Sequence, residues 1–258
     1  MKVLVTVAEV GTVEDDFEID GTAIDERYLE YDLNEWDDYA VEEAVQLVEE
    51  GLADEVVTVT IGPERSEETI RMALAKGADR SVRVWDDSFD GLLDVGVKTE
   101  LLRAVVAEEE PDLILTGVQT GDAMFGATGV SLASAVDLPW AAVVNDLEFD
   151  GETAHVHREL EGGVEELTDV ETPAVLTIQT GINEPRYASL RGIRQAQSKE
   201  IAVKTLTDLG IDGVESRLEM TEMYEPDVEG DATVFEGSAE ETAVQLAGAL
   251  REKGVGAQ

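Results

Sequence analysis

Short apolar segments that alternate with amphipathic ones cover the first two thirds of the chain. The runs Val3–Val7 and Val56–Ile61 are typical of buried strands, and residue 34 begins a segment whose apolar residues have helical spacing. Because neighbouring parallel strands need a crossover, this alternation predicts an α/β fold with a doubly wound, mostly parallel, Rossmann-like sheet. We expect helices at 34–50, 66–76, 98–109 and 126–136, and further strands at 81–85, 113–116 and 174–178.

The pattern changes between residues 141 and 180. Three segments there alternate polar with apolar residues and are joined by Gly-containing turn signals. We therefore expect antiparallel strands added to the parallel sheet, at 143–149, 154–160 and 164–170. An Asp-Gly turn also predicts a hairpin at 17–22.

The last third of the chain has fewer signs of an independent core. A basic segment begins at Asn183, a polar stretch follows it, and an amphipathic helix is expected at 238–253. We therefore expect an α/β domain at 1–182, a loop that binds a partner at 183–200, and a C-terminal arm with the terminal helix at 201–258.

The chain carries a large excess of negative charge. Asp and Glu number 59 against 18 Lys and Arg, which gives a formal net charge of −41. The carboxylates are spread over the whole length and not gathered in one block, which favours a surface adapted to a salt-rich, halophilic cytoplasm, where ions screen the self-repulsion. A chain of this charge is not expected to bind DNA or RNA.

Several kinds of chemistry are disfavoured by what the chain lacks. It has no Cys, and its two histidines, His155 and His157, share one strand face with no further histidine, so no metal site is expected. Carboxylate pairs are too frequent for any one to be singled out as catalytic. The chain shows no run of membrane-spanning length and no signal-peptide pattern, so we expect a cytoplasmic protein without membrane insertion.

The carboxyl ends of the predicted parallel strands offer a candidate ligand site, because ligands bind a doubly wound sheet where its strand order reverses. Thr6–Ala8, Ile61–Pro63 and the loop Gly117–Gly129 would meet there, and the loop can present backbone N–H groups and hydroxyls to a phosphate. A tight strand-to-helix connection explains the same small residues equally well. The chain has no Walker A motif and no G-x-G-x-x-G fingerprint, which disfavours a P-loop hydrolase or a dinucleotide-dependent dehydrogenase.

A cluster of positive charge stands out at 186–194, where three of the twelve arginines fall within nine residues. Arginine, tyrosine and an apolar anchor form a typical recognition set, and four of the residues are spaced to share one face of a short helix. The alternative is a basic loop folded onto the protein's own acids. The expected partner-binding residues are Tyr187, Leu190, Arg191, Ile193 and Arg194.

Four segments, in this order, resemble the β subunit of electron transfer flavoproteins. They are Asn34-Glu35-Trp36-Asp37 with the helix after it, Gly62-Pro63 with Ala73–Arg80, the stretch Arg158–Thr177, and Asn183–Tyr187. The resemblance extends from the start of the chain to about residue 201.

The resemblance implies an electron-carrier subunit without catalytic turnover. Such a subunit forms a heterodimer with an α subunit, on which its terminal helix packs and which supplies most of an FAD site. It binds AMP without a redox role, or a second FAD in relatives that bifurcate electrons. Its loop docks acyl-CoA dehydrogenases of fatty acid oxidation through a leucine that matches Leu190, and the reduced flavin then passes electrons to a quinone oxidoreductase.

Carried over by position, the resemblance also assigns the cofactor contacts. Two departures leave the identity of the nucleotide open: residues 8–12 replace the family's Lys-x-Val-Pro-Asp, and Gly126-Ala127 replaces an amide-bearing pair. The contacts are Thr6, Asn34, Glu35, Trp36, Asp37, Ile61, Gly117, Gln119, Thr120, Gly121, Asp122, Gly126, Ala127 and Thr128.

Two other classes of protein compete with this interpretation. A single-chain adenine-nucleotide-binding protein of the stress-sensor type has a similar fold, but it gives no reason for the antiparallel insertion or the basic segment. An enzyme of the nucleotide α-hydrolase class would need a phosphate-gripping Ser/Gly motif after the first strand, and residues 8–12 offer none.

Overall fold

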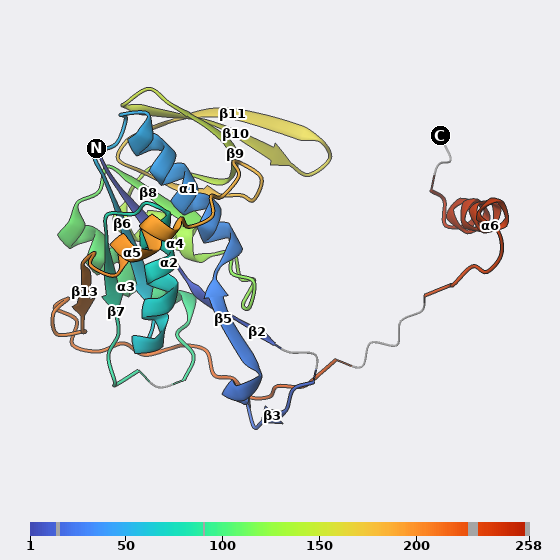
Figure 1. Cartoon of the computed structure of the whole chain (residues 1–258), viewed down its shortest axis with the longest axis horizontal. Helices are drawn as coiled ribbons and strands as arrows, with labels where there is room; N and C mark the ends of the chain where they lie inside the picture. Colours follow the sequence, from blue (N-terminus) through green and yellow to red (C-terminus); the bar gives the residue numbers. More distant parts are fainter. Residues whose placement is uncertain (14–15, 90, 227–231, 256–258) are drawn as a thin grey trace. The chain divides into compact units, whose positions relative to one another are not determined.

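The computed structural model describes residues 1–13, 16–89, 91–226 and 232–255 (Figure 1). The chain has two compact units, Met1–Met223 and Tyr224–Gln258, and each is described on its own. The second unit contains helix α6 (Ala239–Glu252), whose N-cap Ser238 forms a reciprocal capping box with Glu241. The terminal helix expected at 238–253 is therefore present.

The first unit is built on one large sheet, whose strand order in the described residues is β11-β10-β9-β12-β8-β1-β6-β7-β13. All neighbours from β9 to β13 in this order pair in parallel, whereas β10 is antiparallel to both β9 and β11. The doubly wound, mostly parallel sheet with added antiparallel strands is thereby confirmed. The strands are β1 (Lys2–Thr6), β6 (Glu55–Ile61), β7 (Arg80–Val84), β8 (Leu113–Gly117), β9 (Trp140–Phe149), β10 (Thr153–Leu160), β11 (Val164–Glu171), β12 (Ala174–Ile178) and β13 (Ile201–Lys204).

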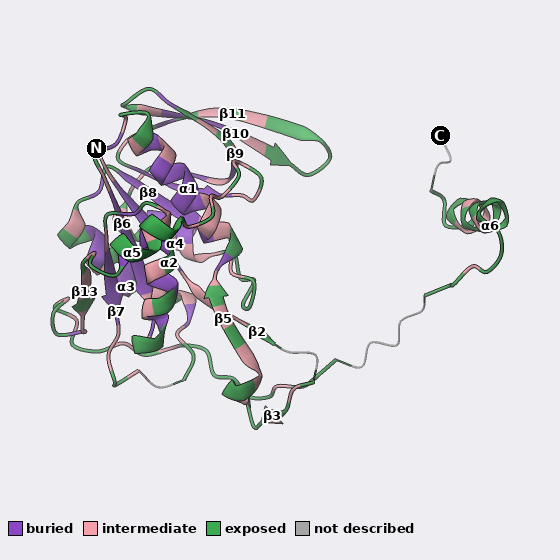
Figure 2. Cartoon of the chain, viewed as in Figure 1, coloured by how far each residue is buried: buried purple, intermediate pink, exposed green. Residues whose placement is uncertain are grey.

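Helices cover both faces of the parallel part of this sheet, and Figure 2 shows the buried layers between them. Strand β1 illustrates the division, because Val3 and Val5 pack into the core under α1 and α2, while Leu4 packs into the core under α3 and α4. Both faces must be apolar for such a sheet, which explains the continuous apolar runs of β1, β8 and β12. The helices are α1 (Glu35–Glu49), α2 (Glu67–Lys76), α3 (Val95–Glu109), α4 (Thr128–Val136) and α5 (Leu190–Ala196).

Some elements were not expected from the sequence. Strand β13 extends the sheet beyond β7, and a separate antiparallel pair joins β2 (Glu9–Val13) to β5 (Leu29–Leu33). The hairpin expected at 17–22 lies at 19–24 instead, as β3 (Ile19–Asp20) and β4 (Ala23–Ile24), with Gly21 at a φ of 65° in its turn.

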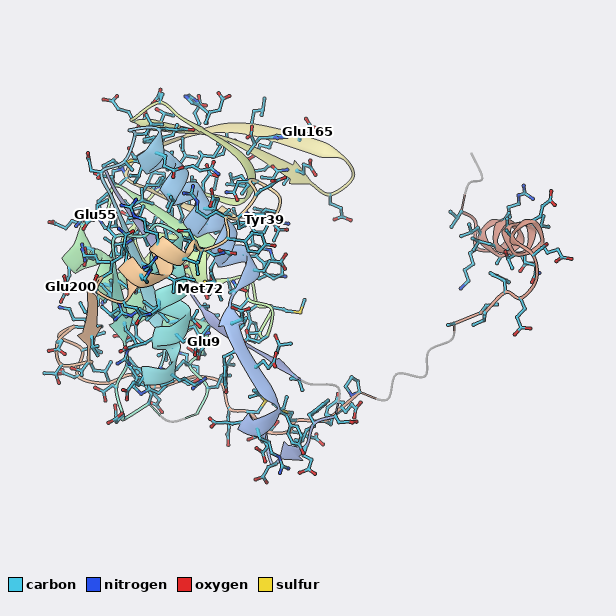
Figure 3. All side chains as sticks on the ribbon, in the orientation of Figure 1. Glu9, Tyr39, Glu55, Met72, Glu165 and Glu200 are labelled. Carbon is cyan, nitrogen blue, oxygen red and sulfur yellow. The ribbon has the colours of Figure 1, made fainter. Side chains whose placement is uncertain are left out.

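Carboxylate side chains lie on strands from different parts of the first unit (Figure 3). Glu55 lies at the start of β6, Glu165 on β11 and Glu200 just before β13. The negative charge is therefore a property of the whole surface and not of one block.

Truncating a buried side chain on the sheet face under α3 and α4 should destabilise the fold by leaving a cavity. Leu4 is fully buried, so Leu4→Ala should lower the free energy of unfolding by about 2–5 kcal/mol. Leu167→Ala on β11 is the matched control, because Leu167 is 81% exposed and should cost much less. Urea unfolding at constant high salt measures both, and equal losses would contradict the assigned core.

Candidate functional site

The order of the strands reverses at β1. The chain proceeds from β1 outward to β6 and β7, then returns across the sheet to β8 on the other side of β1. The carboxyl ends of β1, β6 and β8 therefore meet at the position where doubly wound sheets bind ligands. A cavity of about 160 Å³ lies there, lined by Thr6 of β1, Ile61 of β6 and Gly117 of β8 together with the starts of α3 and α4.

A buried carboxylate connects two of these strand ends. The backbone N–H of Ala8, after β1, donates to Asp37 Oδ2 at 2.8 Å, and the N–H of Gly117, at the end of β8, donates to Asp37 Oδ1 at 2.9 Å. Burial raises the pKa of Asp37 to about 6, against the opposing effect of these hydrogen bonds. A Cβ on Gly117 would lie 2.6 Å from Asp37 Oδ1, so only glycine permits this approach.

The residue that begins α1 holds the loop of the cavity. Asn34 is the N-cap of α1, but its side chain makes no capping hydrogen bond. Instead, its Nδ2 donates to the carbonyl oxygen of Gln119 at 2.9 Å, and its Oδ1 accepts from the N–H of Gly121 at 3.3 Å. Asn34 therefore orders the Gly117–Gly129 loop instead of satisfying its own helix.

The structure places most of the sequence-predicted cofactor contacts around the cavity. Four of them do not line it. Of these, Asn34 and Gly121 bond to each other in support of the loop, Trp36 Nε1 donates to Gln179 Oε1 at 2.9 Å, and Glu35 is exposed. Those that line it are Thr6, Asp37, Ile61, Gly117, Gln119, Thr120, Asp122, Gly126, Ala127 and Thr128.

The sequence did not predict that α3 and the segment before it line one side of the cavity. Helix α3 begins at Val95, three residues before the expected start, with Asp94 as its N-cap accepting from the N–H of Val97. Lys98 therefore lies in the first turn of the helix and lines the cavity, where it is the one cation among the described lining residues. The Asp94 cap, followed by apolar residues at helical spacing, was the signal for the earlier start. The other missed lining residues include Glu9, Leu92, Leu93 and Phe125.

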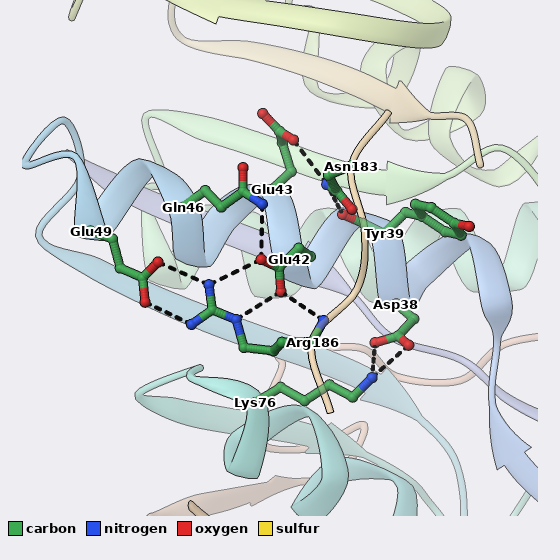
Figure 4. Close-up of polar contacts among 9 residues, drawn as sticks. All are labelled: Asp38, Tyr39, Glu42, Glu43, Gln46, Glu49, Lys76, Asn183 and Arg186. Atoms are coloured by element: carbon green, nitrogen blue, oxygen red, sulfur yellow. Dashed lines mark hydrogen bonds and ion pairs between the residues drawn. The ribbon is translucent and has the colours of Figure 1, made fainter. Parts of the chain in front are cut away.

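A second region forms where the chain returns over α1 after β12 (Figure 4). Arg186 pairs with Glu42 at 2.8 Å and with Glu49 at 2.6 Å, and Asn183 Nδ2 donates to Glu43 Oε2 at 2.9 Å. Glu42 and Glu43 are both buried, although they are acidic residues of an amphipathic helix. Burial raises the pKa of Glu43, and the hydrogen bond from Asn183 opposes that shift.

The alternative of a basic loop folded onto internal acids is correct for Arg186 but not for the arginines after it. Arg191 and Arg194 are exposed, and neither makes an ion pair within the described part of the chain. Leu190, Ile193 and Arg194 lie on α5, as expected for a shared helix face. Tyr187 precedes α5, because the chain is still extended at Ser189, so its placement on that helix is wrong.

The two histidines lie on β10 beside carboxylates. His155 Nδ1 is 2.7 Å from Asp169 Oδ1, and His157 Nε2 is 3.5 Å from Glu165 Oε2. Asp169 hydrogen-bonds to His155 and raises its pKa. Within the described ranges, no group of three or more such side chains is placed to hold a metal ion. No helix among the described residues is long and apolar enough to cross a membrane.

The doubly wound sheet, with a cavity at its switch point lined by a Gly- and Thr-rich loop, defines the class as a Rossmann-like α/β protein. The electron transfer flavoprotein domain family matches residues 21–209. The chain is 45% identical over 98% of both chains to the electron transfer flavoprotein subunit beta of Methylophilus methylotrophus. It is 39% identical to that of Bradyrhizobium diazoefficiens and 38% identical to the mitochondrial one of Oryza sativa subsp. japonica, over 88% of this chain and 90% of each relative. The chain belongs to the electron transfer flavoprotein β-subunit family.

The buried Asp37 predicts a specific dependence of stability on pH. Its folded pKa of about 6 lies above the unfolded value, so its stabilising contribution is complete at low pH and is lost as the pH rises through 6. Between pH 5 and 8, the stability of the wild type relative to Asp37→Asn should fall by about 1 kcal/mol. Urea unfolding of both proteins at constant salt measures this difference.

Asp94→Asn is the control for this experiment. Hydrogen bonds from backbone N–H groups, first that of Val97, lower the pKa of Asp94, so its contribution is lost only as the pH falls below the usual carboxylate range. The difference in free energy of unfolding between Asp94→Asn and the wild type should stay constant between pH 5 and 8. If the difference between Asp37→Asn and the wild type were also constant over this range, the raised pKa assigned to the buried Asp37 would be contradicted.

Proposed function

We propose that this chain is the β subunit of a heterodimeric electron transfer flavoprotein. In this role it accepts electrons from acyl-CoA and related dehydrogenases and passes them to a quinone oxidoreductase, as a carrier without catalytic turnover of its own. The observation that carries the proposal is similarity along almost the whole chain, 45% over 98%, to a protein named for that subunit. The α subunit, in this proposal, supplies most of an FAD site that the two chains share.

The switch-point cavity is proposed to bind AMP. The cavity lies where the strand order reverses, and the Gly117–Gly129 loop that lines it can present backbone N–H groups to a phosphate. Lys98 and the N-terminus of α4 at Thr128 supply positive charge for one phosphate group. The backbone of the Gly117–Gly129 loop and Asp122 are then free to contact the ribose and base.

The second unit is proposed to pack on the α subunit. Helix α6 is amphipathic, and its apolar side chains Val244, Leu246 and Leu250 are 71%, 49% and 41% exposed. No residue of α6 is buried, and the described part of this unit contains no buried residue. An amphipathic helix without a core is stabilised when its apolar face is covered by a partner.

The proposed setting is a salt-rich cytoplasm. The net charge of −41 over 258 residues makes the folded chain repel itself in dilute buffer, and about 1 M salt shortens the Debye length to roughly 3 Å. The carboxylates are spread over the length of the sequence, and Figure 3 shows labelled glutamates on β2, β6 and β11, which supports this proposal.

The test is the ligand content of the complex. We expect the chain, co-expressed with its α subunit in high salt and purified, to carry one FAD and one AMP per heterodimer by absorbance and mass spectrometry. Two FAD would instead identify a bifurcating member of the family. A stable homodimer of the chain alone that binds ATP would favour a stand-alone nucleotide sensor, and a complex without flavin would contradict the proposal.

The proposed phosphate contact can be tested separately. Lys98→Ala should weaken AMP binding by roughly tenfold or more, because a charge-assisted hydrogen bond is lost. Titration calorimetry on the nucleotide-stripped heterodimer gives the affinity. Lys204→Ala is the control, since Lys204 pairs with Glu108 outside the cavity. An unchanged affinity of Lys98→Ala for AMP would show that Lys98 does not contact the nucleotide.

A further inference from the structure

The switch-point cavity has oppositely charged groups on its two sides. Lys98 and the start of α4 line it on the side of α3 and α4, which pack on one face of the sheet. Glu9 of β2 also lines it, but the Glu9 side chain contacts the start of α2, which packs on the opposite face. A ligand with an anion at one end and a hydrogen-bond donor at the other is therefore oriented by the cavity itself.

The carboxylate of Glu9 is held in place by its protein neighbours. Only 7% of the Glu9 side chain is exposed. Ser66 Oγ donates to Glu9 Oε1 at 3.0 Å, and Arg65 Nε lies 3.1 Å from the same oxygen. The guanidinium of Arg65 in turn stacks on the ring of Tyr31 in β5, 4.0 Å from its centroid. Glu9 therefore joins the pair β2 and β5 to the start of α2, and a group fixed in this way is suited to recognise a ligand.

The second carboxylate oxygen of Glu9 keeps the capacity to accept a hydrogen bond. Glu9 Oε2 lies 3.5 Å from Thr69 Oγ1, a distance at which a hydrogen bond is weak. An ionised carboxylate has about four lone-pair sites. A buried carboxylate whose sites are not filled is destabilised, so a donor supplied by a ligand is more favourable here than at an exposed acid.

The other carboxylates that line the cavity are less suited to this task. Both oxygens of Asp37 already accept from backbone N–H groups. The two oxygens of Asp94 do the same, with the N–H groups of Val97 and Arg217. Asp122 is exposed, so water competes for any hydrogen bond that it accepts. Glu9 therefore combines burial, a fixed position and a free acceptor.

We infer that Glu9 makes the cavity selective for adenine, because its carboxylate accepts a hydrogen bond from the exocyclic amino group of the base. The inference rests on the proposed function, in which the cavity binds AMP. A phosphate at Lys98 and the start of α4 leaves the base for the side where Glu9 lies. Hypoxanthine has a carbonyl oxygen in place of the amino group, so it would set one acceptor against another and is disfavoured.

The experiment compares AMP with IMP, the hypoxanthine nucleotide, by titration calorimetry on the nucleotide-stripped αβ heterodimer in high salt. The wild type should bind AMP at least about tenfold more tightly than IMP. In Glu9→Gln the two affinities should lie within about threefold of each other, because a carboxamide can donate to the carbonyl oxygen of IMP as well as accept from the amino group of AMP. IMP should bind this variant more tightly than it binds the wild type.

Glu68→Gln is the matched control. Glu68 lies in the first turn of α2, is exposed, and is not among the described residues that line the cavity. The control removes the same charge as Glu9→Gln and should keep the preference of the wild type for AMP. Thermal unfolding of each variant confirms that the fold is kept, and the wild-type ratio of the two affinities tests the inference without any substitution.

Equal affinities of the wild type for AMP and IMP would overturn the inference and leave the proposed function intact. The same holds if Glu9→Gln keeps the wild-type preference, or if it weakens both nucleotides to the same degree, as a purely structural role of Glu9 would. A wild-type heterodimer that binds neither nucleotide would overturn both the inference and the proposed AMP site. The two failures are thus distinguished by the wild type alone.

Discussion

The carboxylate of Asp37 holds the functional end of the sheet together. Its two oxygens accept hydrogen bonds from Ala8 after β1 and from Gly117 at the end of β8, the two strands between which the order of the sheet reverses. Asp37 belongs to the first turn of α1, so the same contacts fix that helix over the strand ends. Asn34, one turn earlier, extends the arrangement to the loop that closes the cavity. The geometry of the cavity therefore depends on two residues at the start of one helix, Asn34 and Asp37.

The scarcity of cations explains the organisation of the rest of the surface. A chain with 18 Lys and Arg against 59 Asp and Glu uses many of its cations to join elements that are distant in sequence. Arg80 links the start of β7 to β6 and α3, and Arg186 ties the returning chain to α1. Arg191 and Arg194 are exceptions, because both are exposed and neither makes an ion pair within the described residues.

Periodicity predicted the parallel sheet because both of its faces are buried, so that strand and helix patterns are strong in β1, β6, α1 and α3. The same reasoning could not find β13 or the pair β2 and β5, because these short, partly exposed strands depend on neighbours that are distant in sequence. The positions of the strand ends predicted where the cavity lies. The contribution of α3 to its lining was missed because the helix begins at Val95, three residues before the predicted start. The partners of a single side chain could not be predicted from the sequence, as Asn34 shows. A residue of this type is typical of a helix cap, but here its side chain bonds to a loop 85 residues away.

We propose that the cavity between the ends of β1 and β8 is a nucleotide site whose strand ends and loop are held by Asp37 and Asn34. An experimental structure of the αβ heterodimer, purified in high salt without added nucleotide, tests it most directly. We expect AMP in this cavity, with its phosphate near Lys98 and the start of α4. The Gly117–Gly129 loop should be held by Asn34, as it is in the isolated chain. An empty cavity, or a nucleotide bound elsewhere on the chain, would contradict it.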